Sequence, residues 1–450
     1  MERNLTSGSV LKNIIYFSLP YMLSYFLQTL YGMADLFIIG QFDGVAGTTA
    51  VSNGSQVMYM LTVIIVGLAM GTTVNIGKAV GRRDREDISR IIGNTFTMFM
   101  TISVVLMVVL ILLVRPIVSV IGTPSQAVEG SVNYLTVCFI GIPFITAYNI
   151  ISSIFRGMGD SKSPMYFIAT ACFANIVLDY LFMGVLKLGP TGAALGTTLS
   201  QTLSVLISLI YIRKKNTGIE LEKSDLKPDK ETIGKILKTG IPVSLQDGFI
   251  QVAFIIITVI ANHRGINDAA AVGIVEKVIG VLFIVPSSML ATVSALSAQN
   301  IGAKKYDRAE KTLRYAIILT VSYGIVVATI TQFISKLIIS LFSPDSTVIL
   351  LGSEYLTGYS WDCIFAGIHF CFTGYFCAYG KSYIGFVHNI ISILFIRIPG
   401  SYLASAMFSD TLLPMGFAAS AGSVLSILIC VGAFIWLKTH SLKNLKSVAS

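Results

Sequence analysis

The sequence predicts an all-α polytopic membrane protein whose chain crosses the bilayer twelve times. Hydrophobic residues make up 54% of the 450 residues and charged residues only 12%, about half the charged fraction of a soluble domain. Apolar runs of about 20 residues, the length of a helix that crosses the hydrocarbon core, recur along the chain. The second half of the sequence repeats features of the first. A surface this apolar needs lipid as its solvent, so we expect a multi-pass protein of the bacterial inner membrane.

Twelve apolar runs reach that length, six on each side of the longest polar segment. They cover residues 14–39, 52–76, 93–115, 132–155, 165–186 and 192–212, and then 236–261, 270–298, 313–340, 355–379, 383–407 and 415–437. We therefore predict an N-lobe at 1–212, a basic linker at 213–235, a C-lobe at 236–440 and a tail at 441–450. The residues before the first run are short and polar, and no small-residue cleavage site follows it. We interpret this run as a retained helix rather than a signal peptide.

The distribution of basic residues predicts the orientation of the chain. If the N-terminus lies inside, the segments on that side hold 26 Lys and Arg residues and the opposite side holds four. Segments rich in Lys and Arg stay in the cytoplasm, so we expect both termini and the linker to be cytoplasmic. This placement accounts for the net charge of +9 without a nucleic-acid partner. The expected partners are the lipid bilayer and small organic molecules, and we expect a monomer.

An internal repeat relates the first six runs to the last six. Pro20 opens the first run, and Pro242 opens the seventh run 222 positions later. Because six crossings return the chain to its starting side, the two repeats run parallel, related by an axis along the membrane normal. Transporters have this architecture, with the substrate site between the halves, whereas channels usually build a pore from subunits. Since the sequence shows no H-E-x-x-H metal motif and no other catalytic constellation, we expect a transporter and not an enzyme.

Charged residues inside the apolar runs are the first candidates for functional sites. A charge at the centre of the bilayer costs about 2.5–3.5 kcal/mol or more, so each one needs a reason. The residues concerned are Asp35, Asp179, Asp247, Glu276, Lys277, Asp362 and Arg397. The acids outnumber the bases by five to two, which favours cationic over anionic cargo.

The acids of the N-lobe stand in polar surroundings. Gln28, Tyr31 and Asp35 share one face of the first helix, and Asn175 lies one turn before Asp179 in the fifth. A carboxylate together with an amide oxygen suits a hard cation such as Na⁺, or a carboxyl group that burial keeps protonated. Two alternatives remain: Asp35 is solvated at the outer interface, or Asn175 and Asp179 form a hydrogen bond between helices.

The C-lobe has a different set of charges. Asp362 and His369 share a face of the tenth helix, and Arg397 follows Asp179 by 218 positions, close to its equivalent in the repeat. Our hypothesis is that Asp362 or Glu276 neutralises Arg397, which then supplies a fixed polar anchor. A purely structural pair or an interface residue is the alternative.

The composition also suggests what the transporter carries. Aromatic residues make up 10% of the chain, and there are 15 methionines. A cavity lined by such side chains accepts flat apolar cations, because aromatic faces attract cations and methionine adapts its shape. We expect Gln28, Tyr31 and Met33 of the first helix to line this cavity.

Three segments of the chain resemble the MATE (multidrug and toxic compound extrusion) family. They are Pro20 with Gln28-Thr29-Leu30-Tyr31 and Ala34-Asp35, then Phe155-Arg156-Gly157-Met158-Gly159-Asp160-Ser161-Lys162-Ser163-Pro164, and Gly189-Pro190-Thr191-Gly192-Ala193-Ala194. The resemblance covers nearly the whole chain. It implies a V-shaped pair of six-helix lobes that exports drug-like organic cations in exchange for Na⁺ or H⁺, by alternating access and with no other cofactor.

The resemblance also implies where the coupling ion binds. In the DinF-like branch an N-lobe site uses an aspartate of helix 1, an asparagine and an aspartate of helix 5 and a threonine of helix 6, which match Asp35, Asn175, Asp179 and, by position, Thr197. The NorM-like branch adds an acid in helix 7, where this chain reads Phe249-Ile250-Gln251-Val252. This departure favours the N-lobe site. The alternative function is a flippase for lipid-linked precursors, from the wider superfamily to which MATE proteins belong.

Overall fold

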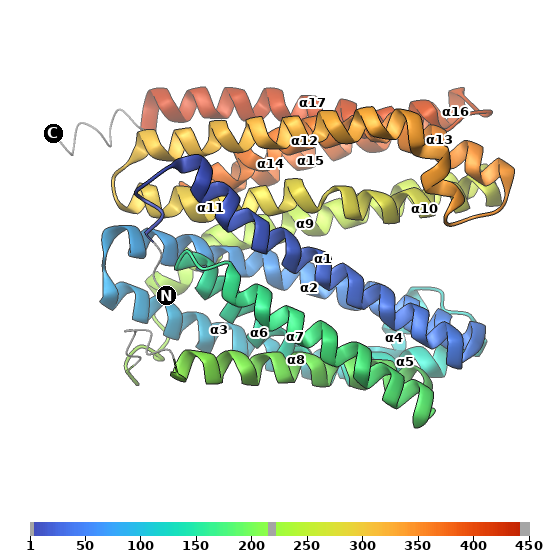
Figure 1. Ribbon diagram of the computed structural model, residues 1–450, viewed down its shortest axis with the longest axis horizontal. Coiled ribbons are helices and arrows are strands. Elements are labelled where there is room, and N and C mark those ends of the chain that lie inside the picture. The colour runs from blue at the N-terminus through green and yellow to red at the C-terminus, as the bar shows by residue number, and fades with distance from the viewer. Residues whose placement is uncertain (1–3, 215–221, 442–450) are drawn as a thin grey trace. The chain divides into compact units, whose positions relative to one another are not determined.

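The computed structural model describes residues 4–214 and 222–441, and every regular element in these ranges is a helix (Figure 1). The first ten elements are α1 Val10–Phe42, α2 Gly44–Arg82, α3 Arg85–Leu112, α4 Val114–Val120, η1 Ser125–Ala127, α5 Val128–Ile140, α6 Ile142–Gly157, α7 Lys162–Asp179, η2 Tyr180–Val185 and α8 Gly189–Lys214. The others are α9 Lys230–Arg264, α10 Ile266–Leu282, α11 Ile284–Gly302, α12 Tyr306–Ser340, α13 Ser346–Tyr359, α14 Asp362–Ala378, α15 Ser382–Ser392, η3 Ile393–Arg397, α16 Ile398–Met407, α17 Leu413–Trp436 and η4 Leu437–Ser441. The predicted tail at 441–450, apart from its first residue, and part of the predicted linker lie outside the described ranges.

The helices confirm the predicted class, an all-α polytopic membrane protein. Among the described residues, ten helices are long and apolar enough to cross a membrane. The pair formed by Ser125–Ile140 and Ile142–Gly157, bent by 49°, gives an eleventh span. The shorter apolar helix α14 follows α13 over the predicted run at 355–379.

Several helices begin earlier than the apolar runs that predicted them. Helix α3 starts at Arg85, because the Asp84 side chain accepts a hydrogen bond from the backbone N–H of Asp87 and caps the first turn. Helix α13 starts at Ser346, where the Asp345 side chain accepts from two backbone N–H groups. The first turns of both helices are polar, so the apolar runs in the sequence do not include them.

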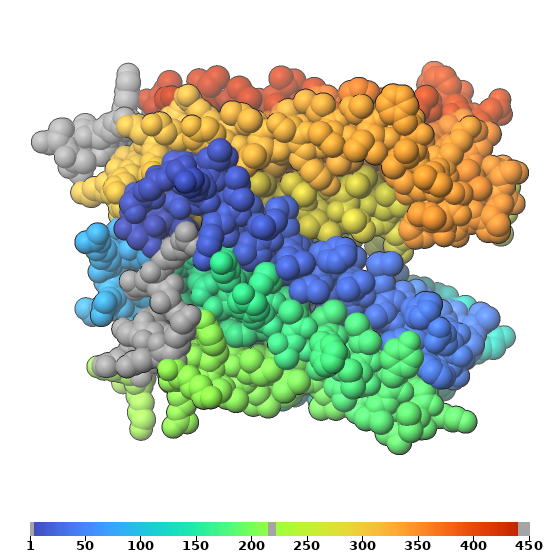
Figure 2. Space-filling view, viewed as in Figure 1, coloured from blue at the N-terminus to red at the C-terminus, as the bar shows by residue number. Residues whose placement is uncertain are grey.

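The described chain packs as two compact units. The first contains Ile15–Gly240, together with Gly302–Lys304 and a short piece near the N-terminus. The second contains Ser7–Ile14, Ile241–Ile301 and the chain from Lys305 onward. On the face shown in Figure 2, the helices of each unit form a closely packed surface. The sequence boundary between the units falls inside α9.

Glycines allow the helices of each unit to approach closely. In the first unit, a Cβ atom at Gly71 of α2 would lie 2.1 Å from the backbone oxygen of Ile236 in α9. In the second unit, a Cβ atom at Gly416 of α17 would lie 2.5 Å from the backbone oxygen of Tyr355 in α13. Small residues at such crossings are typical of membrane helix bundles, where close packing replaces the hydrophobic effect between helices.

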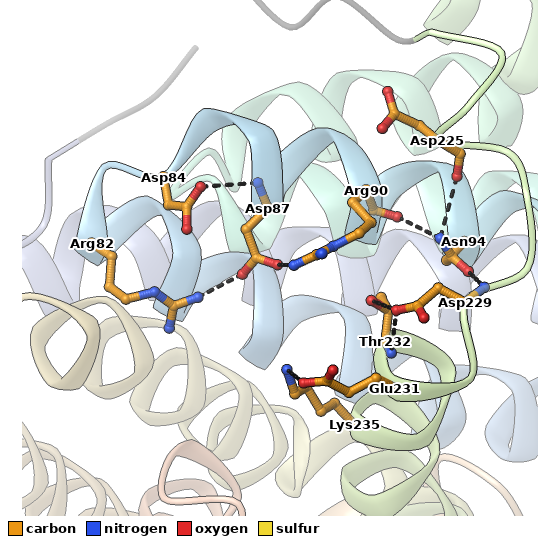
Figure 3. Close-up of polar contacts among 10 residues, drawn as sticks. All are labelled: Arg82, Asp84, Asp87, Arg90, Asn94, Asp225, Asp229, Glu231, Thr232 and Lys235. Atoms are coloured by element: carbon orange, nitrogen blue, oxygen red, sulfur yellow. Dashed lines mark hydrogen bonds and ion pairs between the residues drawn. The ribbon is translucent and has the colours of Figure 1, made fainter.

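The segment before α9 is fastened to α3 (Figure 3). Asn94, which is 1% exposed, donates its side-chain amide to the backbone oxygens of Arg90 and Asp225, at 3.0 and 3.2 Å. Its side-chain oxygen accepts from the backbone N–H of Asp229 at 2.6 Å. Asp229 in turn caps α9, and hydrogen bonds from Thr232 hold the pKa of its carboxyl group below the ordinary value. One buried amide therefore sets where α9 begins.

We expect Asn94→Ala to lower the thermal stability of the purified protein. The substitution leaves backbone groups of the segment without partners, and such a loss costs about 1–3 kcal/mol. Thermal unfolding in detergent measures it. The control is Asn53→Ala, which removes a single 3.3 Å hydrogen bond to Thr123. Equal unfolding temperatures for the two variants would show that the hydrogen bonds of Asn94 contribute no more stability than the single bond of Asn53.

In the second unit, Arg264 binds the connection between α16 and α17. The Arg264 side chain, 7% exposed, pairs with Asp268 through Nε at 2.7 Å. Its two terminal nitrogens donate to the backbone oxygens of Ser405, Phe408, Ser409 and Thr411, at distances of 2.8 to 3.2 Å. The guanidinium thereby joins the end of α9 to the connection between α16 and α17.

Arg264→Gln should therefore destabilise the protein markedly. Removing one partner of a buried charge pair costs about 3–5 kcal/mol, and four carbonyl groups lose a donor as well. The unfolding midpoint in detergent reports the loss. Arg314→Gln is a matched control, because Arg314 pairs with Glu310 from a side chain that is 69% exposed, and exposed pairs contribute about 0–1 kcal/mol. The prediction fails if both variants unfold at the same temperature.

Candidate functional site

Two carboxylic acids meet inside the first unit. Asp35 of α1 is 3% exposed, and Asp179, the last residue of α7, is fully buried. Their carboxyl groups lie side by side. The hydroxyl of Thr197 in α8 donates to Oδ2 of Asp35 at 3.1 Å, and Asn175 lies next to Asp35 from one turn before Asp179. The structure thus brings together all four residues expected at the ion site.

Apart from the bond between Thr197 and Asp35, most polar atoms of this cluster lack a hydrogen-bond partner in the structure. Oδ1 of Asp35, both carboxyl oxygens of Asp179 and both side-chain amide atoms of Asn175 are buried without a hydrogen bond in the structure. Among the described residues, no basic side chain forms an ion pair with either acid. Two buried carboxylates cannot both stay ionised without a compensating positive charge. The cluster therefore requires a proton or a bound cation.

The donor atoms indicate which cation fits. The described residues contain no group of three or more His, Cys, Asp and Glu side chains that could hold a metal ion. Carboxylate, amide and hydroxyl oxygens suit hard cations such as Na⁺ rather than soft transition metals. A proton on either carboxyl group satisfies the same cluster.

Gly196 is a site residue that the sequence reasoning missed. A Cβ atom at this position in α8 would lie 2.0 Å from Oδ1 of Asp179 and 3.6 Å from the side-chain nitrogen of Asn175. The absence of a side chain at Gly196 therefore leaves the space that the Asp179 carboxyl group occupies. A signal was present in the sequence, because Gly192 and Gly196 form the G-x-x-x-G spacing that marks close helix packing.

Backbone irregularities surround the acid pair. The π-helical segment η2 begins directly after Asp179, and π-helical turns often mark functional sites. The break between α5 and α6 lies at Gly141, where a Cβ atom would come within 2.8 Å of the Thr198 side chain. Two of the helices around the cluster are thus interrupted at its level.

The predicted cavity residues divide into two groups. Tyr31 lies beside Gln201 and close to Asp35, and Gln28 lies beside Tyr148 of α6. These side chains extend the polar cluster along α1. Met33 is 55% exposed and lies on a different face of the helix.

The charged candidates of the second unit lie within electrostatic reach of one another, since Asp362 and Glu276 both act on Arg397. Arg397 hydrogen-bonds the hydroxyl of Tyr359 and lies 5.1 Å from the centre of the Phe254 ring. Glu276 accepts from the Thr258 hydroxyl at 2.9 Å. Ion pairs of Arg397 with Asp362 or Glu276 are absent among the described residues. An aromatic hydroxyl and ring thus contact the guanidinium directly, and neutralisation by Asp362 or Glu276 stays a prediction.

Asp362 contributes to a separate polar group. It is 1% exposed, its Oδ1 atom has no hydrogen-bond partner in the structure, and it lies beside Ser423 of α17. The Ser423 hydroxyl is 3.3 Å from Nε2 of His369. The side chains of Asp362 and His369, which share a helical face, therefore both lie next to Ser423.

A family model described as MatE matches the chain twice, at residues 20–181 and 242–403. The chain belongs to the MatE family. The matches start 222 positions apart, the spacing of Pro20 and Pro242, so they reproduce the internal repeat. MatE proteins are transporters, and this one is a multi-pass transporter of the bacterial cell membrane rather than an enzyme.

Curated relatives and solved structures cover nearly the full length. The probable multidrug resistance protein YoeA of Bacillus subtilis is 28% identical over 96% of this chain and 95% of its own. The multidrug export protein MepA of Staphylococcus aureus is 26% identical over 89% of each chain. Among solved structures, an outward-facing multidrug resistance MATE family transporter of the MOP superfamily has a TM-score of 0.91 at 21% identity and covers 99% of each chain. The fold of this MatE protein is therefore the twelve-helix MATE fold.

Aligning the sequences of the two matched segments shows that only the first half contains the acid pair. The 222-residue spacing places Ile257 at the position of Asp35, Arg397 at that of Asn175 and Ser401 at that of Asp179. In this MatE protein, neither aspartate has a carboxylate counterpart in the second half.

Proposed function

We propose that this MatE protein exports small organic molecules, organic cations among them, in exchange for Na⁺ or H⁺ bound at Asp35 and Asp179. The observation that carries the proposal is the buried acid pair: three of its four carboxyl oxygens lack a hydrogen-bond partner in the structure, and no basic side chain of the described residues forms an ion pair with it. The relatives YoeA and MepA carry names that refer to multidrug resistance and multidrug export, which supports cargo of this class.

The proposed mechanism is alternating access. A cation or proton arriving from outside neutralises the acid pair, and the neutral pair favours a different packing of α1 against α7 and α8. Helix α1 contains Pro20, which removes one backbone hydrogen bond and makes this helix easier to bend. The change in α1 expels the cargo, and release of the ion to the inside resets the cycle.

The membrane potential supplies enough energy when the cargo is neutral. When one monovalent ion exchanges for one monovalent organic cation, no net charge crosses the membrane and the concentration gradient of the ion drives the exchange. Each positive charge that enters down a potential of 100 mV releases about 2.3 kcal/mol. Since about 1.4 kcal/mol corresponds to a tenfold concentration ratio, one charge concentrates a neutral cargo outside by a few tens of times. The N-lobe pair alone therefore suffices, without an acid pair in the second half.

Transport assays with separately imposed gradients test the proposal. The purified protein is reconstituted into liposomes with a fluorescent organic cation, and a Na⁺ gradient or a pH gradient is applied. We expect efflux driven by one of the gradients and a flux of the same ion that the dye stimulates. Efflux that follows neither gradient would refute coupling. Translocation of a labelled lipid in place of the dye would support the flippase alternative.

A further inference from the structure

A second charged group lies buried in the first unit, away from the acid pair. Arg156, next to the last residue of α6, is 9% exposed. Its Nε atom is enclosed and has no hydrogen-bond partner in the structure. The guanidinium lies over the ring of Tyr21 in α1, 4.1 Å from its centre. No acid of the described residues forms an ion pair with it.

Two hydroxyl groups lie on the same face of α6 as Arg156. Ser152 precedes it by one turn and Tyr148 by two, so the three side chains form a row along the helix. The hydroxyls of Ser152 and Tyr148 are both buried without a hydrogen-bond partner in the structure. Tyr148 lies beside Ser152 and within the electrostatic reach of Arg156. The Arg156 Nε atom and two hydroxyl groups without a hydrogen-bond partner in the structure thus lie along one face of α6, with the Gln28 side chain of α1 beside Tyr148.

The nearest acid in the sequence is engaged elsewhere. Asp160 follows Arg156 by four positions, but its carboxyl group accepts from the backbone N–H groups of Lys162 and Ser163, at 3.0 Å each, and from the Ser163 hydroxyl at 2.6 Å. It therefore serves as the cap of α7. Lys162 adds a second positive charge, and its ammonium group lies 4.3 Å from the ring centre of Tyr16 in α1. Among the described residues, Asp160 forms no ion pair with Arg156, so the guanidinium has no carboxylate in direct contact.

A buried guanidinium without a compensating anion is unfavourable. The Tyr21 ring covers one face of the guanidinium but leaves its edges free to donate hydrogen bonds. The planar edge of arginine matches the oxygens of a phosphate group, and such charge-assisted pairs are among the strongest hydrogen bonds in proteins. Serine and tyrosine hydroxyls add donors for a third oxygen.

We propose that Arg156, Ser152 and Tyr148 bind a phosphate group, supplied by an anionic lipid headgroup or by inorganic phosphate. The Arg156 end of the site is distant from the acid pair, because Tyr21 and Asp35 are 14 residues apart on α1, or about 21 Å along a helix. The Tyr148 end borders Gln28 and Tyr31, which extend from the acid pair. Arg156 lies at the end of its span beside the connection to α7, the depth at which headgroups meet helix ends. The bound phosphate neutralises the guanidinium and links α6 to α1 through Tyr21.

The experiment measures binding and needs no transport. The protein is delipidated in detergent and titrated separately with inorganic phosphate and with phosphatidylglycerol. Native mass spectrometry counts the bound molecules, and thermal unfolding reports the affinity. We expect one tightly bound molecule for one of the two probes, and this probe identifies the source of the phosphate. Arg156→Gln should weaken its binding about tenfold or more, the usual effect of losing a charge-assisted pair.

Three further variants make the result decisive. Ser152→Ala and Tyr148→Phe keep the charge and should each weaken binding several-fold, so the proposal is testable even if Arg156→Gln does not fold. Arg115→Gln removes the same charge from a side chain that is 66% exposed and should leave binding unchanged. The proposal is overturned if neither probe binds, if the Ser152 and Tyr148 variants bind like wild type, or if Arg115→Gln weakens binding as much as Arg156→Gln.

Discussion

Asp35→Asn should reduce ion-driven efflux at least tenfold, to the level of liposomes without protein, while the variant still inserts and folds. Asparagine has the shape of the protonated aspartate, so it keeps the hydrogen bond with Thr197 and fixes position 35 in the neutral state, while Asp179 remains as a single acid. Neither a proton nor Na⁺ can then be exchanged at this position. The cargo can bind without any ion exchange, so the affinity of the protein for the cargo should change by only a few-fold.

The measurement for Asp35→Asn is dye efflux from proteoliposomes under an imposed gradient, combined with dye binding to the detergent-solubilised protein. Glu129→Gln is the control, since the Glu129 side chain is 68% exposed and pairs with Arg115. Its efflux should equal that of wild type. Export by Asp35→Asn at the wild-type rate would show that the coupling ion binds elsewhere.

Gly196→Ala is expected to disable the ion site without touching either acid. The added methyl group would lie 2.0 Å from Oδ1 of Asp179, so the carboxyl group must turn away or α8 must move. Overpacking of this kind costs about 1–3 kcal/mol. We expect a lower unfolding temperature and efflux reduced about tenfold or more, because the two carboxyl groups no longer lie side by side.

A double-mutant cycle separates the clash from other effects of Gly196→Ala. In the Asp179→Ala background the carboxyl group is absent, so adding Gly196→Ala should cost much less stability than it does in wild type. Gly234→Ala is the matched control, because no atom lies within 4 Å of a Cβ atom there. This helical substitution should be neutral or stabilise by about 0.4–1 kcal/mol. Equal losses of stability in both backgrounds would show that the added methyl group does not clash with Asp179.

The sequence predicted the fold well because the bilayer imposes simple rules. A span must be long, apolar and helical, and these properties can be read directly from the order of residues. The breaks within spans could not be predicted in the same way. Pro143 follows Gly141 and Asp362 follows Ser360, but a proline also lies inside the continuous helix α1 and an acid too, so such residues do not mark a break by themselves. Only packing shows that α5 and α6, or α13 and α14, are separate helices.

The candidate site was predictable where charge made it conspicuous. Asp35 and Asp179 stood out because acids are rare in apolar runs, and Asn175 because it lies one turn from Asp179. Thr197 came from the family resemblance alone. Gly196 carries no charge, and its role depends on how closely α8 approaches the end of α7.

Arg156 and Arg397 show why contacts of buried cations are hard to predict. Basic residues near helix ends were assigned to the aqueous side by their charge, yet Arg156 is buried against an aromatic ring 135 positions earlier in the chain. Arg397 was expected to have an acidic partner; Asp362 and Glu276 act on it electrostatically, and its direct hydrogen bond goes to a tyrosine hydroxyl that the sequence did not indicate. Aromatic residues are so frequent in this sequence that none of them signals a cation in advance.

The fifth span of each half contains a π-helical segment next to a charged residue: η2 directly follows Asp179, and η3 ends at Arg397. A π-helical turn adds a residue to a helix and so rotates whatever comes after it. The two segments do not occupy the same place in the repeat, because the 222-residue spacing places η2 opposite residues 402–407, after η3. Each half thus places a charge of opposite sign beside its own irregular main chain, so a substitution at one charge alters the ligand preference of that half alone.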